Sequence, residues 1–171
     1  LVLTVDTAVL ANRENNLRAG FSTPLRFTPK TVWQFATRPG WVFGTFGRTL
    51  VTQGMPHFEN SYSTRGAPIM SRNVTRDFGR KDHLNWDHLR LIRDQWRGKL
   101  VVKGVLAHQD IKEIVALGCD GIILSNHGGR QLDGTVSPLR VLPDAIKAAD
   151  NIPVMIDGGF RRGTDVIKAL A

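Results

Sequence analysis

A histidine and an arginine lie three residues apart in the stretch Ser125–Asp133, which reads Ser-Asn-His-Gly-Gly-Arg-Gln-Leu-Asp. His127 can accept a proton near neutral pH, and Arg130 can hold a carboxylate through two parallel hydrogen bonds. The two glycines between them let the backbone approach a ligand closely. These residue types predict a site that binds a small organic acid and removes a proton from it. The alternative is that His127 is only a hydrogen-bonded loop histidine.

This stretch follows a short apolar run that is typical of a buried strand, and the chain around it alternates between helices and strands. The expected helices cover about 86–96, 109–117, 138–149 and 162–171, and the expected strands cover Leu1–Asp6, Leu100–Gly104, Gly121–Leu124 and Pro153–Asp157. Such alternation predicts a parallel sheet covered by helices, so the predicted fold class is α/β.

Polar side chains stand at or just after the end of each expected strand: Asp6, Lys103, Ser125 and Asp157. Because the carboxyl ends of parallel strands lie at one edge of a sheet, we expect these side chains to converge near His127. An isolated buried lysine is costly, so Lys103 should meet an anion or an electron-rich ring. The alternative is that Lys103 only forms an ion pair with Asp6 or Asp157.

The last expected strand is followed by two adjacent glycines and a cation, Gly158, Gly159 and Arg161, just before a helix. Backbone N–H groups, a helix N-terminus and a cation together favour phosphate binding. Two glycines also make ordinary turns between a strand and a helix, so this pattern alone is weak. Its place at the same edge of the sheet strengthens it.

Charge and composition limit the classes of partner. The net charge of +8 and the pI near 10.4 favour anionic partners. The single cysteine, Cys119, excludes an internal disulfide, and its apolar neighbours predict a packed, unreactive thiol. No apolar run is long enough to cross a bilayer, and no metal site is predicted. Nucleic-acid binding is disfavoured because no known nucleic-acid-binding module accompanies the basic charge.

Residues 21–82 form a long stretch without sustained periodicity, apart from a short helix expected at about Pro29–Thr37 with Thr28 as its cap. The stretch holds nine Lys or Arg against three Asp or Glu, and nine of the 13 aromatic residues fall between Phe21 and Tyr62. This composition argues against simple disorder. It predicts a basic, aromatic-rich insertion that lies on an anionic membrane surface, with a solvated lid over the site as the alternative.

Four stretches together resemble the FMN-dependent 2-hydroxy-acid oxidases and dehydrogenases, the family of glycolate oxidase, mandelate dehydrogenase and quinone-linked L-lactate dehydrogenase. They are Ser125–Asp133, Thr4–Thr7 with Arg13, Val102–Gly104 and Asp157–Gly163. The resemblance covers residues 1–20 and 84–171. It implies that residues 1–171 form part of a (β/α)8 TIM barrel, approximately strands four to seven, with residues 21–82 as a variable insertion after the first strand present.

The resemblance also implies roles for the polar residues. His127 matches the general base, Asp6 the carboxylate that orients it, and Arg130 with Arg13 the pair that holds the substrate carboxylate. Lys103 matches the cation near flavin N1 and O2. The other residues implied in binding FMN are Thr4, Ser125, Asp157, Gly158, Gly159, Phe160 and Arg161.

The expected reaction is oxidation of an (S)-2-hydroxy acid, of the L-lactate or mandelate type, to the 2-oxo acid, with a quinone or oxygen as electron acceptor. The family resemblance further implies a homo-oligomeric parent in the cytoplasm, peripheral at the inner face of the cell membrane through residues 21–82. The chain opens on a strand without methionine and closes within an amphipathic helix. The alternative is therefore a truncated, non-catalytic fragment that is inactive without the missing barrel segments.

Overall fold

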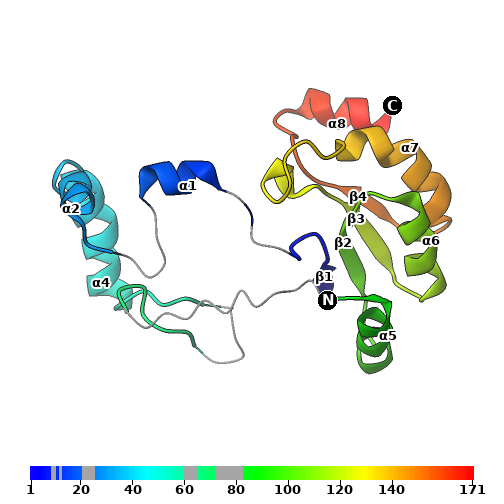
Figure 1. Cartoon of the computed structure of the whole chain (residues 1–171), viewed down its shortest axis with the longest axis horizontal. Coiled ribbons are helices and arrows are strands. Elements are labelled where there is room, and N and C mark those ends of the chain that lie inside the picture. Colours follow the sequence, from blue (N-terminus) through cyan, green and yellow to red (C-terminus); the bar gives the residue numbers. More distant parts are fainter. Residues whose placement is uncertain (9–10, 12, 21–25, 60–64, 72–82) are drawn as a thin grey trace. The chain divides into compact units, whose positions relative to one another are not determined.

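The protein is described here by a computed structural model, which covers residues 1–8, 11, 13–20, 26–59, 65–71 and 83–171 (Figure 1). The chain divides into two compact units. Unit 1 comprises Leu1–Asn12 with Arg80–Ala171, and unit 2 comprises Arg13–Gly79. The limits of unit 2 lie close to those of the insertion expected at residues 21–82.

Unit 1 is a parallel four-stranded sheet with strand order β1-β2-β3-β4 (Figure 1). The strands are β1 (Val2–Thr4), β2 (Val101–Val105), β3 (Gly121–Leu124) and β4 (Val154–Ile156). The helices are α5 (Trp86–Gln95), α6 (His108–Ala116), α7 (Pro138–Ala149) and α8 (Gly163–Leu170). This arrangement confirms the predicted alternation and the α/β class.

The core of unit 1 lies between one face of the sheet and helices α5, α6 and α7. The side chains of Leu100, Ile111, Ile122 and Leu124 have no exposed surface. Burial of this apolar surface is the main force that holds the helices on the sheet. Cys119 is also buried, and its burial raises the pKa of the thiol, which confirms the packed thiol expected from the sequence.

The first strand differs from the expectation of a buried strand. Leu1 and Val2 are each 53% exposed, whereas Leu3 and Val5 pack against the core. Alternate residues of a strand point to opposite faces, so Val2 faces away from the core that Leu3 joins. Apolar character alone did not reveal which face of the strand is covered.

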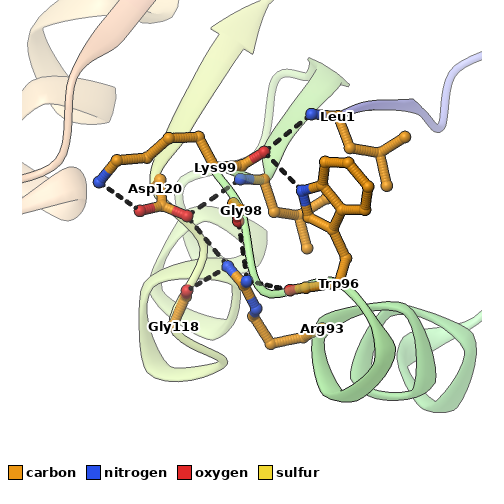
Figure 2. A network of polar contacts seen from close by, with 8 residues as sticks. Leu1, Arg93, Trp96, Gly98, Lys99, Gly118 and Asp120 are labelled. Carbon is orange, nitrogen blue, oxygen red and sulfur yellow. Dashed lines mark hydrogen bonds and ion pairs between the residues drawn. The ribbon is translucent and has the colours of Figure 1, made fainter.

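A network of polar contacts ties the elements together at the amino ends of the strands (Figure 2). Asp120 accepts hydrogen bonds from Lys99 Nζ at 2.9 Å and from both the Leu100 N–H and Arg93 Nη1 at 3.0 Å. The hydrogen bonds from Lys99 and Leu100 lower the pKa of Asp120 most, and together with the Arg93 hydrogen bond and the Lys99 charge they bring it from 3.8 to about 2. The Asp120 carboxylate thus joins helix α5 to the start of β2 and the turn before β3.

Arg93 extends the network to three backbone carbonyl groups (Figure 2). Its guanidinium donates to the carbonyl oxygens of Gly98 at 2.9 Å, Gly118 at 3.3 Å, and Trp96. The Leu1 nitrogen and Trp96 Nε1 both donate to the Lys99 carbonyl, at 2.8 and 3.0 Å. These contacts satisfy backbone groups at the edge of the sheet that lies opposite the predicted site.

Unit 2 is helical. Its elements are α1 (Glu14–Ala19), α2 (Pro29–Ala36), α3 (Pro39–Trp41), the π-helix η1 (Val42–Gly47) and α4 (Arg48–Gln53). Helix α2 confirms the short helix expected at Pro29–Thr37, since Thr28 Oγ1 accepts the Thr31 N–H at 3.2 Å. Within the described parts of the chain, no helix is both long and apolar enough to cross a membrane.

The expectation that the rest of the insertion lacks regular structure was wrong for residues 39–53. Pro39 stands in the first helical turn, where its missing N–H costs nothing. Gly40, Gly44 and Gly47 lie inside a continuous helical run that widens to a π-helix. Widened turns distort the spacing of apolar residues, which hides the helical period in the sequence.

The low pKa of Asp120 predicts a pH-dependent stability. Because the folded pKa is depressed, the stabilisation is complete above about pH 4 and is lost as the pH falls through about 2. Asp120→Asn should lower the melting temperature at pH 6, and the gap from wild type should narrow between pH 4 and 2. Asp144→Asn is the control, since Asp144 is exposed and lies 3.9 Å from Lys147. A gap that stays constant with pH would contradict the assignment.

Candidate active site

Side chains from β2, β3 and β4 meet at the carboxyl edge of the sheet. The ammonium group of Lys103 lies 2.9 Å from Ser125 Oγ and 2.9 Å from Asp157 Oδ2. The predicted convergence of these strand ends is therefore confirmed. The pairing of Lys103 with Asp157, which the sequence left open as an alternative, is also observed. Ser125 has no exposed surface, so its hydroxyl anchors this cluster below the rim.

Asp6 and His127 form the second contact at this edge. His127 Nδ1 lies 3.1 Å from both carboxylate oxygens of Asp6, although 121 residues separate the two in sequence. A carboxylate can only accept, so Nδ1 carries the proton, and the lone pair of a neutral imidazole is then on Nε2. Among the described residues, no hydrogen bond or ion pair involves Nε2. The geometry leaves that nitrogen free to accept a proton from a ligand.

The backbone of His127 is held in a conformation that non-glycine residues rarely adopt. Its φ is 57°, at the start of the 3₁₀ helix η2 (His127–Gly129). The His127 N–H donates to Ser125 Oγ at 3.0 Å, so the same hydroxyl that meets Lys103 also fixes the histidine backbone. Such strain costs on the order of 1 kcal/mol or more and persists only where neighbouring groups enforce it. The imidazole of this strained residue is the one that meets Asp6.

Asn126 is a further residue of this loop that the sequence interpretation did not single out. Its Oδ1 accepts the Gly129 N–H at 3.3 Å, and its Nδ2 donates to the Val136 carbonyl at 3.4 Å. The side chain therefore closes the turn that carries His127 and Arg130. An asparagine ahead of a glycine-rich turn is a known signal for this arrangement.

Gly104 is the second residue that the sequence interpretation missed. A Cβ atom built on Gly104 would lie 2.6 Å from Asp6 Cγ, and the φ of Gly104 is +98°. The pairing of β2 with β3 shifts register between Lys103 and Val105, as in a β-bulge. A glycine at this point makes room for the Asp6 carboxylate. A glycine near a strand end is the available signal, and it does not by itself name the partner.

Asp157 carries an unused acceptor. Burial alone would raise its pKa, but hydrogen bonds from Ser125 and Lys103 and the charge of Lys103 outweigh burial, so the pKa lies below its usual value. Its Oδ1 atom is buried and has no hydrogen-bond partner among the described residues. A buried acceptor without a partner indicates that a donor from a ligand belongs there.

The turn after β4 is open to a ligand. Gly158 and Gly159 have φ values of +93° and +82°, and a Cβ atom on Gly159 would meet nothing within 4 Å. The N–H groups of Arg161 and Arg162 already donate to Asp165 Oδ2, at 2.9 and 3.1 Å. The start of helix α8 thus has its own carboxylate cap. The glycine N–H groups and the exposed side chain of Arg161 are candidates to hold an anion here.

Four other predicted site residues lie outside the two contacts described above. Thr4 pairs with Lys103 in the β1–β2 register, Arg130 is exposed on the histidine loop, and Phe160 is half-buried after the two glycines. Arg13 belongs to unit 2, where it is the exposed N-cap residue of helix α1. Its pairing with Arg130 around one carboxylate stays a prediction.

The sequence profile of the FMN-dependent dehydrogenases matches residues 1–171, the whole chain. The chain belongs to the FMN-dependent dehydrogenase family. It is 42% identical over 177 residues to (S)-mandelate dehydrogenase of Pseudomonas putida, covering all of this chain and 42% of that protein. It is 39% identical over 181 residues to L-lactate dehydrogenase of Caulobacter sp. (strain K31), covering 44% of that protein.

Solved structures agree with this assignment. A crystal structure described as that of the monotopic membrane protein (S)-mandelate dehydrogenase matches with a TM-score of 0.83 and 41% identity, over all of this chain and 44% of that one. The fold is thus part of a TIM barrel, as expected from the sequence. The chain spans less than half the length of these relatives.

FMN is the cofactor of the family, and the carboxyl edge of the sheet fits it. The unpartnered Asp157 Oδ1 could accept a hydrogen bond from a ribityl hydroxyl, and the open turn at Gly158 and Gly159 could receive a phosphate. Lys103 supplies a cation that is 21% exposed beside them. Among the described residues, no group of three or more His, Cys, Asp or Glu side chains could hold a metal ion.

The close approach of Gly104 to Asp6 makes a specific prediction about stability. Gly104→Ala should lower the free energy of unfolding by about 2 to 4 kcal/mol, because it adds both backbone strain and a steric clash. Gly118→Ala is the control, since Gly118 has a φ of +73° but open space around it. It should cost only the strain, about 1 kcal/mol.

A double variant separates the cost of the backbone strain from the cost of the steric clash. Removing the Asp6 side chain with Asp6→Gly should recover the steric part of the Gly104→Ala loss, measured by urea denaturation. Strictly additive losses from the two substitutions would show that Gly104 does not make room for Asp6.

Proposed function

We propose that this chain carries the base and part of the flavin site for FMN-dependent oxidation of an (S)-2-hydroxy acid, of the L-lactate or mandelate type, to the 2-oxo acid. The observation that carries the proposal is the Asp6–His127 pair beside the Lys103–Ser125–Asp157 cluster. Both relatives named above are dehydrogenases of such acids by name. FMN, when bound, supplies the two-electron acceptor for the oxidation.

His127 is the proposed general base. Its Nε2 takes a proton from the substrate, and the Asp6 carboxylate keeps the proton on Nδ1 and stabilises the imidazolium that results. Asp6 is only 14% exposed, so its charge is weakly screened at the distance of 3.1 Å. Three features hold the contact in place. Gly104 leaves room for Asp6, the Ser125 hydroxyl accepts the His127 N–H, and Asn126 closes the turn that carries His127.

Arg130 is the proposed clamp for the substrate carboxylate. It stands three residues after the base on the same short turn, and its N–H donates to the His127 carbonyl at 3.3 Å. No ion-pair partner of Arg130 is found among the described residues, so its guanidinium is available for a ligand. Arg13 is proposed as the second guanidinium at the same carboxylate.

Lys103 and the residues after β4 are the proposed flavin bed. Lys103 would place a positive charge beside the bound flavin, where it would stabilise the negative charge of the reduced ring. Thr4 and Ser125 are proposed as polar contacts to the ring. Asp157, Gly158, Gly159, Phe160 and Arg161 are proposed to hold the ribityl and phosphate groups.

Replacement of the base tests the chemical step. His127→Asn should slow the reduction of bound FMN by an (S)-2-hydroxy acid by about 10² to 10⁴-fold, as expected for the loss of general base catalysis. FMN affinity, measured by flavin fluorescence, should change little. His108→Asn, on the exposed start of helix α6, is the control. An unchanged reduction rate in His127→Asn would remove His127 from the mechanism.

The second candidate is a non-catalytic fragment, favoured by the share of each relative that the chain covers, 42% to 44%. The two candidates differ in what the isolated 171-residue chain does. Stoichiometric FMN binding with turnover by this chain would exclude the non-catalytic fragment. A quinone analogue and oxygen should both be tried as acceptors, because the described site contains no group that selects between them.

We also propose that unit 2 makes a peripheral contact with an anionic membrane, at the inner face of the cell membrane. A relative with the same fold is described as monotopic. In unit 2, Trp33, Phe43 and Val51 are 70%, 76% and 88% exposed. Exposed apolar side chains among cations are typical of interfacial anchors. The homo-oligomeric state of the parent likewise stays a proposal.

Vesicle co-sedimentation tests the membrane contact. The chain should sediment with vesicles that contain anionic lipid, and deletion of residues 27–70 should abolish this. The difference in sedimentation between the intact and the deleted chain should be larger at low salt than at high salt. Salt screens the attraction between the basic residues and the anionic lipid, over about 10 Å at 0.1 M salt. Equal sedimentation of the intact and deleted chains would exclude unit 2 as the anchor and leave the lid as its role.

A further inference from the structure

Two cavities of similar size adjoin within unit 2. The first, which we call the apolar cavity, has a volume of about 410 Å³ and is lined by residues that include Phe27, Phe46, Thr49, Ile69 and Met70. The second, which we call the Arg38 cavity, has a volume of about 420 Å³ and is lined by Gln34, Phe35, Thr37, Arg38 and Trp41. Both volumes are within the range of small-molecule sites.

The two cavities share a wall of aromatic rings. Phe35 and Trp41 line both of them. The rings of Phe35 and Trp41 stack with centroids 5.8 Å apart and planes 13° apart, and Trp41 and Phe46 stack at 5.9 Å and 10°. The shared wall makes the cavities neighbours, one apolar and one with a charged group. A ligand that spans both must have an apolar part and a polar part.

The charge of the polar part follows from the ion pairs of unit 2. Its described carboxylates are already matched: Glu14 lies 3.0 Å from Arg18, and Glu59 lies 2.9 Å from Arg65. Arg38 has no side-chain partner among the described residues. Its guanidinium suits a phosphate, which it can bind through two parallel hydrogen bonds.

We propose that these cavities bind one anionic phospholipid, with an acyl chain in the apolar cavity and the phosphate at Arg38. The inference rests on the membrane contact proposed above and deepens it. An interfacial patch needs only surface charge and exposed rings, whereas this site holds a single lipid with fixed stoichiometry. The rings of Phe35 and Trp41, which line both cavities, would lie between the acyl chain of the lipid and its headgroup.

A soluble short-chain lipid distinguishes binding at this site from adsorption to a membrane surface. Dioctanoyl-phosphatidylglycerol, kept below its critical micelle concentration, should bind the full chain saturably at one site by isothermal titration calorimetry. Dioctanoyl-phosphatidylcholine should bind at least about tenfold more weakly, because it carries no net negative charge. Octanoate that binds as tightly as the phosphatidylglycerol would overturn the choice of a phospholipid.

Two pairs of variants test the two cavities. Arg38→Gln should weaken binding about tenfold, as expected for the loss of a charge-assisted contact. Arg48→Gln is its control, since Arg48 is exposed on helix α4 and lines neither cavity. Thr49→Phe should fill the apolar cavity and abolish binding. Val51→Phe is its control on the same helix, where Val51 is 88% exposed.

The outcomes distinguish this site from the membrane contact itself. Equal losses in Arg38→Gln and Arg48→Gln, or tight binding by Thr49→Phe, would overturn the lipid site. Sedimentation with vesicles without saturable binding of the soluble lipid would keep the membrane contact and overturn the lipid site. Saturable binding without sedimentation would support the site and reject the membrane anchor.

Discussion

The contact between Asp6 and His127 is the interaction on which the proposed chemistry depends. It joins the residue after β1 to the loop after β3, two elements that are far apart in the sequence. β2 lies between them in the sheet, so the contact must reach across that strand. The positive φ of Gly104 and the register shift beside it create the space. The fixed tautomer of His127 therefore depends on the sheet, and not on the histidine loop alone.

Ser125 connects this pair to Lys103 and Asp157, where we propose that the flavin binds. One buried hydroxyl meets the ammonium of Lys103 and the backbone N–H of His127. The positions of the His127 backbone and of the Lys103 ammonium group are thus set by the same side chain. The amino edge of the sheet is stabilised separately by the Asp120 and Arg93 network, which leaves the carboxyl edge free for function. This division is common in barrels of parallel strands.

Much of unit 1 could be predicted from the sequence because its signals are local. Apolar runs and the polar residues after each strand follow short-range rules. The convergence of Lys103, Ser125 and Asp157 followed from the parallel order alone. The roles of Gly104 and Asn126 could not be predicted, because they depend on what approaches them from another strand or turn. In unit 2 the π-helix distorted the apolar period, and the run from Pro39 to Gln53 was missed.

The central claim is that the Asp6–His127 pair acts as one base next to the flavin bed. The most direct measurement is an anaerobic titration of the FMN-loaded chain with (S)-mandelate or L-lactate, followed by flavin absorbance, for wild type and Asp6→Asn. The account predicts bleaching in the wild type, and much slower bleaching with unchanged FMN affinity in the variant. Equal bleaching rates in the two proteins, or a wild type that binds FMN but is not bleached by either acid, would contradict it.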